Sequence, residues 1–197
     1  LSGSALKRLK TYCEKKNMAF LCAAFDFDSV DLLTDDLKVK SMKVASSEVT
    51  NLPMLEYIAK KNVAVILSTG ASTLEEVGAA VRTLKNAGCP ELILLHCVSS
   101  YPTPPEQANL RAMATMAKEF GLPVGFSDHT QGIDVSIAAA AMGAAAVEKH
   151  FTLDCNQEGP DHRASIEPHQ LKAMVQGIHN ASVARGDGIK RPAPCEE

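Results

Sequence analysis

Two apolar segments of this chain each end in a histidine, a residue type that can bind metal ions or transfer protons. His129 follows residues 124–128, His150 follows residues 145–149, and the alanine-rich segment 133–142 lies between them. This order predicts a strand, a helix and a second strand, so the two strands are expected to be parallel neighbours. Both histidines then lie at the carboxyl edge of one sheet, where α/β folds place their active sites. Two imidazoles at this edge predict a site for a divalent metal ion.

A lysine within an apolar segment is the second feature that could do chemistry. Lys43 lies within residues 42–46, and burial of an unpaired ammonium group costs free energy. Its position indicates an anionic ligand or, alternatively, an amine that forms a Schiff base. The structural alternative is a lysine that extends to the rim of the sheet or forms a salt bridge with Glu48.

Hydroxyl groups end the next two apolar segments. Ser68 and Thr69 precede a predicted helix start, where hydroxyls and free backbone amides suit a phosphate group. Ser99 and Tyr101 lie in a loop that contains three prolines. Together with Lys43 and the histidines, these groups predict a metal-assisted enzyme that acts on a small phosphorylated or sugar-like molecule.

The other histidines are interpreted as structural or exposed. His96 lies inside an apolar segment and is expected to be a hydrogen-bonded core residue rather than a metal ligand. His169 and His179 fall on the predicted last helix and are expected on its solvent side. The polar loop at 158–165 adds the carboxylate of Asp161.

A strand-then-helix pattern repeats along most of the chain and predicts a TIM (β/α)8 barrel, an α/β fold. The predicted strands are 18–24, 42–46, 63–69, 92–98, 124–127 and 145–150. The predicted helices are 4–16, 29–36, 52–60, 73–87, 110–120, 133–142 and 168–185, with a capping box at Ser72 and Glu75. A complete barrel has eight such units and about 250 residues, so we expect an N-terminally truncated portion of about six βα units. An open six-stranded sheet is the alternative.

Composition and charge exclude several classes of protein. The chain has 197 residues, 46% of them hydrophobic, a formal net charge of −3 and six cysteines without a Cys-x-x-Cys pair. The charge argues against a nucleic-acid partner, and no apolar run is long enough to span a membrane. We find no secretory pattern, so a reduced, cytoplasmic protein is expected. Residues 1–188 are expected to form the barrel domain, and residues 189–197 a linker toward an absent further domain.

Seven short motifs occur in an order and spacing that resemble the sialic acid (N-acetylneuraminate) synthase family, which includes legionaminate and pseudaminate synthases. The motifs are Phe25-Asp26-x-x-Ser29-Val30, Lys43-x-Ala45-Ser46-x-Glu48, Leu67-Ser68-Thr69-Gly70, Ser99-Ser100-Tyr101-Pro102, Ser127-Asp128-His129-Thr130, Glu148-Lys149-His150-Phe151-Thr152 and Gly159-Pro160-Asp161-His162. The resemblance covers about Lys7 to Pro194. It implies a TIM barrel followed by an antifreeze-like C-terminal domain, usually in a homodimer.

The resemblance also implies a reaction and roles for individual residues. Members of the family condense phosphoenolpyruvate with an N-acetylmannosamine-type sugar, with C–O cleavage, release of phosphate and help from Mn²⁺ or Mg²⁺. By resemblance, His129 and His150 hold the metal ion. Phosphoenolpyruvate contacts Lys43, Ser46, Ser68, Ser99 and Ser127, and the acceptor sugar contacts Glu48, Tyr101 and Asp161. Lys43, Glu48 and Asp161 are the expected catalytic residues.

Some features depart from the family pattern. Ala23 and Ala24 stand where the family has Thr-Pro, and the N-terminal strands with the acidic general base are expected to be missing. The 197-residue chain alone is therefore predicted to be inactive. The alternatives are a Schiff-base sugar-acid aldolase that uses Lys43 or Lys149, a metal-dependent hydrolase, and a non-catalytic truncated barrel that acts as a binding module.

Overall fold

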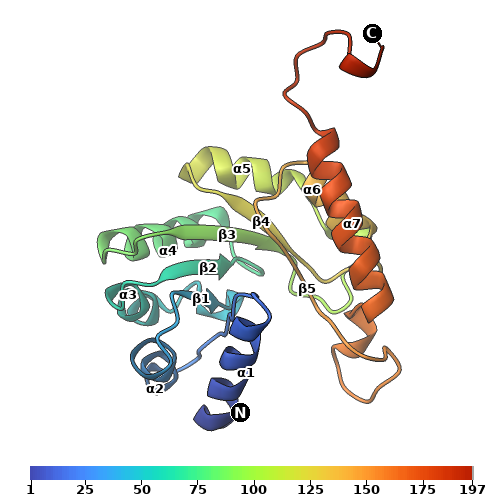
Figure 1. Ribbon diagram of the computed structural model, residues 1–197. Helices are drawn as coiled ribbons and strands as arrows, with labels where there is room; N and C mark the ends of the chain where they lie inside the picture. Colours follow the sequence, from blue (N-terminus) through green and yellow to red (C-terminus); the bar gives the residue numbers. More distant parts are fainter. Residues whose placement is uncertain (197) are drawn as a thin grey trace.

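The protein is an α/β structure in which five parallel strands form one curled sheet (Figure 1). The computed structural model describes residues 1–196. The strands pair in chain order: β1 (Ser41–Val44), β2 (Ala64–Ser68), β3 (Leu92–Cys97), β4 (Val124–Asp128) and β5 (Val147–Lys149). Because every pair is parallel, the carboxyl ends of all strands lie at the same edge of the sheet.

Helices connect the strands and cover the outer face of the sheet (Figure 1). They are α1 (Gly3–Lys15), α2 (Phe27–Asp31), α3 (Leu52–Lys60), α4 (Leu74–Asn86), α5 (Arg111–Phe120), α6 (Asp134–Ala141) and α7 (Pro168–Ala184). A π-helical turn, Leu32–Asp36, follows α2, and short 3-10 helices are formed by Ser46–Glu48, Pro105–Gln107, His162–Ala164 and Pro194–Glu196. Within residues 1–196, no helix is both long and apolar enough to cross a membrane.

The hydrophobic core lies between the sheet and helices α3 to α6. Buried side chains of the strands, such as Leu67, Leu94 and Phe126, belong to the same cluster as Leu55 of α3 and Leu84 of α4. All five residues of β4 are buried. The core therefore holds the middle of the sheet rigidly and leaves the carboxyl ends of the strands free to carry polar groups.

The predicted strand at 18–24 is wrong. This segment makes a single parallel bridge, between Ala23 and Lys43, in which the Lys43 amide donates to the Cys22 carbonyl at 3.2 Å. Met18 and Leu21 are exposed, so the segment lacks the burial on both faces that stabilises a parallel strand. The described part of the chain consequently has five strands instead of the predicted six.

The other predicted strands and the helices are confirmed, with small shifts at their ends. The last strand is shorter than 145–150, and the capping box is formed one residue later than predicted, by Thr73 and Glu76. Glycines follow two of these helices: Gly121 ends α5 in the left-handed conformation, and Gly143 follows α6 with a positive φ. The capping box is displaced by one residue because Ser72 and Thr73 are neighbours and each is followed three residues later by a glutamate.

Gly125 of β4 is required by the close approach of the neighbouring chain. A Cβ at this position would lie 2.7 Å from Leu95 Cδ2 and 2.9 Å from the Ala146 backbone nitrogen. We expect Gly125→Ala to lower the free energy of unfolding by about 3 kcal/mol, because a strand backbone cannot move aside cheaply. Urea denaturation measures this change.

The matched control is the same substitution in α4. At Gly78 the added methyl group would meet the flexible end of Arg82 at 3.2 Å. Gly78→Ala is expected to stabilise the protein slightly, by up to about 1 kcal/mol, because alanine favours the helical backbone. Equal effects of the two substitutions would contradict this account of the β4 packing.

A candidate active site at the carboxyl ends of the strands

A cavity of about 310 Å³ lies at the carboxyl edge of the sheet. Each of the five strands contributes a polar side chain to its lining: Lys43, Ser68, Cys97, Ser127 and Glu148. The remaining lining residues come from the loops that follow the strands, namely Ala45, Ser46, Ser47, Ser99, Tyr101, His129 and His150. Eight of the predicted site residues therefore meet in one cavity, because parallel pairing brings all strand ends to one edge.

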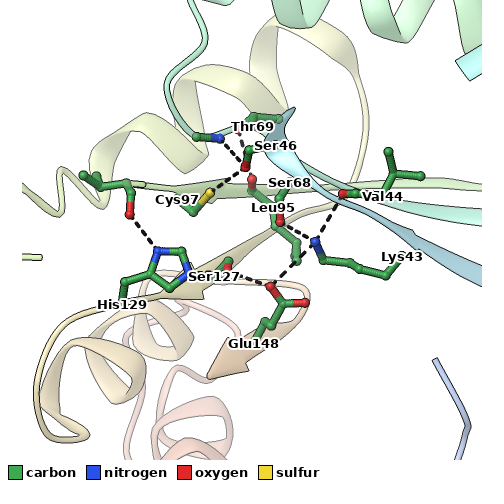
Figure 2. A network of polar contacts seen from close by, with 12 residues as sticks. Lys43, Val44, Ser46, Ser68, Thr69, Leu95, Cys97, Ser127, His129 and Glu148 are labelled. Atoms are coloured by element: carbon green, nitrogen blue, oxygen red, sulfur yellow. Dashed lines mark hydrogen bonds and ion pairs between the residues drawn. The ribbon is translucent and has the colours of Figure 1, made fainter. Parts of the chain in front are cut away.

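Lys43 occupies one wall of the cavity and is largely shielded from water (Figure 2). Its Nζ donates to Ser68 Oγ at 2.8 Å and to the Val44 carbonyl at 3.2 Å. The same nitrogen lies 3.7 Å from Glu148 Oε1, an oxygen that also accepts a hydrogen bond from Ser127 Oγ at 2.7 Å. The ammonium group is thus held in position by groups from β1, β2 and β5 before any ligand binds.

The alternative pairing of Lys43 with Glu48 is wrong. Glu48 is buried and accepts hydrogen bonds from Asn51 Nδ2 at 2.8 Å and from Ser47 Oγ at 3.1 Å. It is the last residue of the short 3-10 helix Ser46–Glu48 and does not line the cavity. Asp161 also lies outside the lining, and its exposed carboxylate comes within 3.9 Å of His150 Nδ1. The structure therefore places these two predicted residues beside the cavity.

Ser46 lines the cavity and is hydrogen-bonded to the backbone of Gly70. Ser46 Oγ accepts a hydrogen bond from the Gly70 amide at 2.9 Å and lies 3.3 Å from Cys97 Sγ. A Cβ on residue 70 would come within 2.9 Å of Cys97 Sγ and 3.1 Å of Ser46 Oγ. Glycine at this position therefore lets the backbone lie directly against the side chains of Ser46, Cys97 and Ser99.

The two histidines stand together across the cavity, as the strand–helix–strand pattern predicts. Their ring centroids are 5.4 Å apart, and Tyr101 packs against His129 with a centroid distance of 4.2 Å. His129 Nδ1 lies 2.7 Å from the Val98 carbonyl, which accepts only from a protonated nitrogen. Burial lowers the pKa of His129 below its ordinary value, so the neutral ring carries its proton on Nδ1 and a lone pair on Nε2.

This donor set fits an open metal site better than a closed one. A neutral imidazole whose other nitrogen donates to a carbonyl is the form in which histidine binds metals. In residues 1–196, no group of three histidine, cysteine, aspartate or glutamate side chains is placed to hold an ion. An ion held by His129 and His150 would need water or substrate oxygens as further ligands, which is typical of catalytic metal sites.

Four residues that line the cavity had no role predicted from the sequence: Ala45, Ser47, Cys97 and Glu148. For Glu148 a signal exists, because it lies two residues before His150 and alternate residues of a strand share a face. Its register partner on β4 is Ser127, a predicted site residue. The facing pair Ser127 and Glu148 could have been found from strand alignment alone.

The structural interpretations of the other histidines are confirmed. His96 Nε2 lies 2.9 Å from the Ala108 carbonyl, whereas His169 and His179 are exposed on α7. A second cavity, about 600 Å³ in volume, lies between α4 and α5. Thr69, His96 and Cys97 reach that cavity, but the residues to which the family resemblance assigns phosphoenolpyruvate, sugar or metal contacts do not line it.

Burial lowers the pKa of Lys43 below the ordinary lysine value of 10.5, and the negative charge of Glu148 opposes this shift. Only the charged ammonium group attracts an anion, so we expect the affinity for inorganic phosphate to fall as the pH rises through this lowered pKa. Titration calorimetry at increasing pH measures the effect, and Lys43→Met should lack the alkaline step. A phosphate affinity that stays constant up to pH 10.5 would contradict the role of Lys43 in binding the anion.

Comparison with known sequences finds a matching family and similar synthases. The sequence profile of the NeuB family matches residues 1–190. The N,N'-diacetyllegionaminic acid synthase of Campylobacter jejuni subsp. jejuni serotype O:2 is 47% identical over 199 residues, which cover 100% of this chain and 59% of that protein. The N-acetylneuraminate-9-phosphate synthase of Drosophila melanogaster is 38% identical over 174 residues, which cover 88% of this chain and 46% of that protein. The chain thus spans less than two thirds of the length of these relatives.

Comparison with solved structures agrees in fold. The crystal structure of N-acetylneuraminic acid (sialic acid) synthetase from Leptospira borgpetersenii serovar Hardjo-bovis has a TM-score of 0.93 and 35% identity, covering 100% of this chain and 68% of that chain. A truncated 3-deoxy-D-arabino-heptulosonate 7-phosphate synthase from Thermotoga maritima has a TM-score of 0.83 and 21% identity, covering 96% of this chain and 75% of that chain. The curled parallel sheet is therefore half of a barrel of the TIM type. By its sequence and its fold, the chain belongs to the NeuB family.

Proposed function

We propose that the protein condenses phosphoenolpyruvate with an N-acetylmannosamine-type amino sugar to give a sialic-acid-like nonulosonate and phosphate. The observation that carries this proposal is one cavity with two unlike walls. A lysine and several hydroxyls, including Lys43, Ser46 and Ser68, lie on one wall, and His129 and His150 lie on the other. Such a cavity suits one anionic reactant and one reactant whose carbonyl is polarised by a metal ion.

The hydroxyl-rich wall is suited to the phosphate and carboxylate of phosphoenolpyruvate. Lys43 Nζ is held by Ser68 and Glu148, so it can meet an anion without losing further side-chain freedom. Ser46, Ser99 and Ser127 offer hydroxyl donors around the same space. Fixed donors of this kind stabilise negative charge that develops on a leaving phosphate.

The histidine wall is assigned to the divalent metal ion, Mn²⁺ or Mg²⁺, and to the acceptor sugar. Bound between His129 and His150, the ion would supply Lewis-acid polarisation of the sugar aldehyde. Tyr101 closes this side of the cavity, and Asp161 lies next to His150, where its carboxylate can accept hydrogen bonds from sugar hydroxyls. Glu48, buried beside the cavity, is assigned to orient the sugar through the loop that carries Ser46 and Ser47.

The proposed reaction forms one C–C bond and breaks one C–O bond. The C3 carbon of phosphoenolpyruvate attacks the aldehyde carbon of the open-chain sugar, a C–C bond forms, and the aldehyde oxygen takes up a proton. Water adds to C2, where positive charge develops, and its proton leaves to solvent or to a base. The bond between C2 and the bridging oxygen then breaks, the new C2 hydroxyl gives its proton to the departing phosphate or to solvent, and a 2-keto acid remains.

The test is an assay of the complete protein with phosphoenolpyruvate labelled with ¹⁸O at the bridging position, N-acetylmannosamine or a diacetamido analogue, and Mn²⁺. Mass spectrometry should find a nonulosonate and ¹⁸O in the released phosphate. Unlabelled phosphate would contradict C–O cleavage. Absence of any nonulosonate with all acceptor sugars would contradict the proposed reaction.

A Schiff-base aldolase is the second candidate, favoured by the lowered pKa of Lys43. Lys149, the other lysine considered for this chemistry, has a side chain only 2% exposed and lies outside the cavity. Borohydride trapping with pyruvate distinguishes the two reactions, because an imine at Lys43 would add mass to the peptide that contains it. The synthase route forms no imine, so an unmodified Lys43 peptide is expected.

The proposal also includes a cytoplasmic location and a homodimer for the complete protein. All six cysteines are unpaired, which suits a reducing compartment. Size-exclusion chromatography with light scattering tests the dimer.

A further inference from the structure

A buried ion pair lies on the side of the sheet opposite to the cavity. Asp128 and Lys149 are register partners at the ends of β4 and β5, and Lys149 Nζ lies 3.1 Å from Asp128 Oδ2. Their side chains are 0% and 2% exposed, respectively. Because successive residues of a strand face opposite sides, this pair points toward α6 while Ser127 and Glu148 point into the cavity.

The pair is the centre of a small polar network that joins three elements. Asp128 Oδ1 accepts a hydrogen bond from the Thr130 amide at 2.8 Å, and Asp128 Oδ2 accepts one from Ser136 Oγ of α6 at 2.5 Å. Lys149 Nζ also donates to the Thr130 carbonyl. The side chain of one strand end is therefore bonded to the backbone just beyond the other.

Each proposed metal-binding histidine directly follows one member of this pair in the chain. His129 is also held from β3, because the Val98 carbonyl accepts from its ring and its own carbonyl accepts from the Thr103 amide at 2.9 Å. His150 has a backbone bond to Ile166, but its strand, β5, is three residues long and pairs in residues 1–196 with β4 alone. Two side-chain contacts link the chain segments that carry the histidines: the Ser127–Glu148 hydrogen bond on the cavity side and the Asp128–Lys149 network behind it.

We propose that Asp128 and Lys149 are positioning residues that set the relative placement of the two imidazoles, and hence the affinity for the divalent ion. This inference rests on the metal site of the proposed function. A contribution to stability alone is a weak reason for such a pair, because apolar residues of similar volume are often as stabilising as a buried ion pair. A fixed geometry, in contrast, requires directional bonds from both strand ends.

The test separates placement from stability by comparing variants of the complete protein. Asp128→Asn/Lys149→Met removes both charges, so no unpaired ion is left buried. We expect this variant to bind Mn²⁺ about 10- to 100-fold more weakly than the wild type, as measured by electron paramagnetic resonance of free Mn²⁺. The visible spectrum of bound Co²⁺ should also change, because it reports ligand geometry. Phosphate affinity through Lys43, measured without metal, should be unchanged.

A matched control and a milder variant keep the test decisive. Val124→Ala shortens a buried side chain at the other end of β4, so it should lower stability and leave Mn²⁺ affinity unchanged. Ser136→Ala removes only the hydrogen bond from α6 to Asp128, and it should weaken Mn²⁺ binding by several-fold even where the double variant does not fold. A folded double variant, or a Ser136→Ala variant, with wild-type Mn²⁺ affinity and Co²⁺ spectrum would overturn the inference.

The wild-type measurements show which proposal fails. If the wild type binds Mn²⁺ through His129 and His150 but the network variants bind it equally well, the positioning role alone is wrong. If the wild type binds no Mn²⁺, the metal site of the proposed function is wrong, and the positioning role falls with it.

Discussion

His129→Ala and His150→Ala are each expected to weaken Mn²⁺ binding by more than about 100-fold and to reduce metal-dependent condensation by at least as much. The reason is that loss of an outer partner of a metal ligand already costs about 10- to 100-fold in affinity, and these substitutions remove the ligand itself. In residues 1–196, no third metal-binding side chain stands ready to compensate. Calorimetric titration of Mn²⁺ measures the first effect, and the rate of nonulosonate formation measures the second.

The control for the histidine variants is His179→Ala, which removes an exposed imidazole of α7 far along the chain from both strand ends. It should leave both Mn²⁺ affinity and turnover unchanged. Phosphoenolpyruvate binding without metal should persist in all three variants, because the anion wall does not include an imidazole. Undiminished turnover in His129→Ala would show that the histidine wall does not hold a catalytic ion.

Lys43→Met is expected to weaken phosphoenolpyruvate binding by about 10- to 100-fold, the equivalent of one charge-assisted hydrogen bond of about 1.5–3 kcal/mol. The substitution also leaves Glu148 in the cavity wall without its cation, which adds repulsion toward the anionic substrate. Lys43→Met/Glu148→Gln removes that carboxylate charge. We expect the double variant to recover part of the affinity, and the remaining deficit measures the direct contribution of the ammonium group.

The control for Lys43 is Lys60→Met, which removes an exposed lysine that pairs with Glu56 on the same turn of α3. An exposed ion pair of this kind contributes little, so substrate affinity and stability should remain close to those of the wild type. Fluorescence or calorimetric titration with phosphoenolpyruvate distinguishes the variants. Equal affinity in Lys43→Met and Lys60→Met would exclude Lys43 from the anion site.

Most elements of the fold were predictable because their signals are local. Apolar runs of strand length, glycine at helix ends and the repeat of strand and helix identify β1 to β5 and α3 to α7 from neighbouring residues alone. The segment 18–24 has the same apolar composition but forms one bridge only. Composition is a local property of the segment. Strand formation also needs a neighbouring strand and burial on both faces, which depend on residues distant in the chain.

The site was predictable in part for the same reason. Parallel strands carry functional residues at their carboxyl ends. This rule alone predicts the place of Lys43, Ser68, Ser127 and the two histidines in the cavity. Glu148 and Cys97 were overlooked, although both lie on strands that were correctly identified. Their importance comes from contacts with Lys43 and Ser46, which are distant in the chain.

The sequence by itself determined that this is a parallel α/β protein with a lysine, hydroxyls and two histidines at one edge of its sheet. It did so because residue types and spacing encode secondary structure, and parallel pairing then places all strand ends together. Only the tertiary structure decided which polar groups share a face. Strand register placed Glu148 in the cavity with Lys43 and buried the adjacent Lys149 against Asp128 behind it. A shift of β5 by one residue in that register would turn Lys149 into the cavity and Glu148 away from it, because side chains alternate between the faces of a strand.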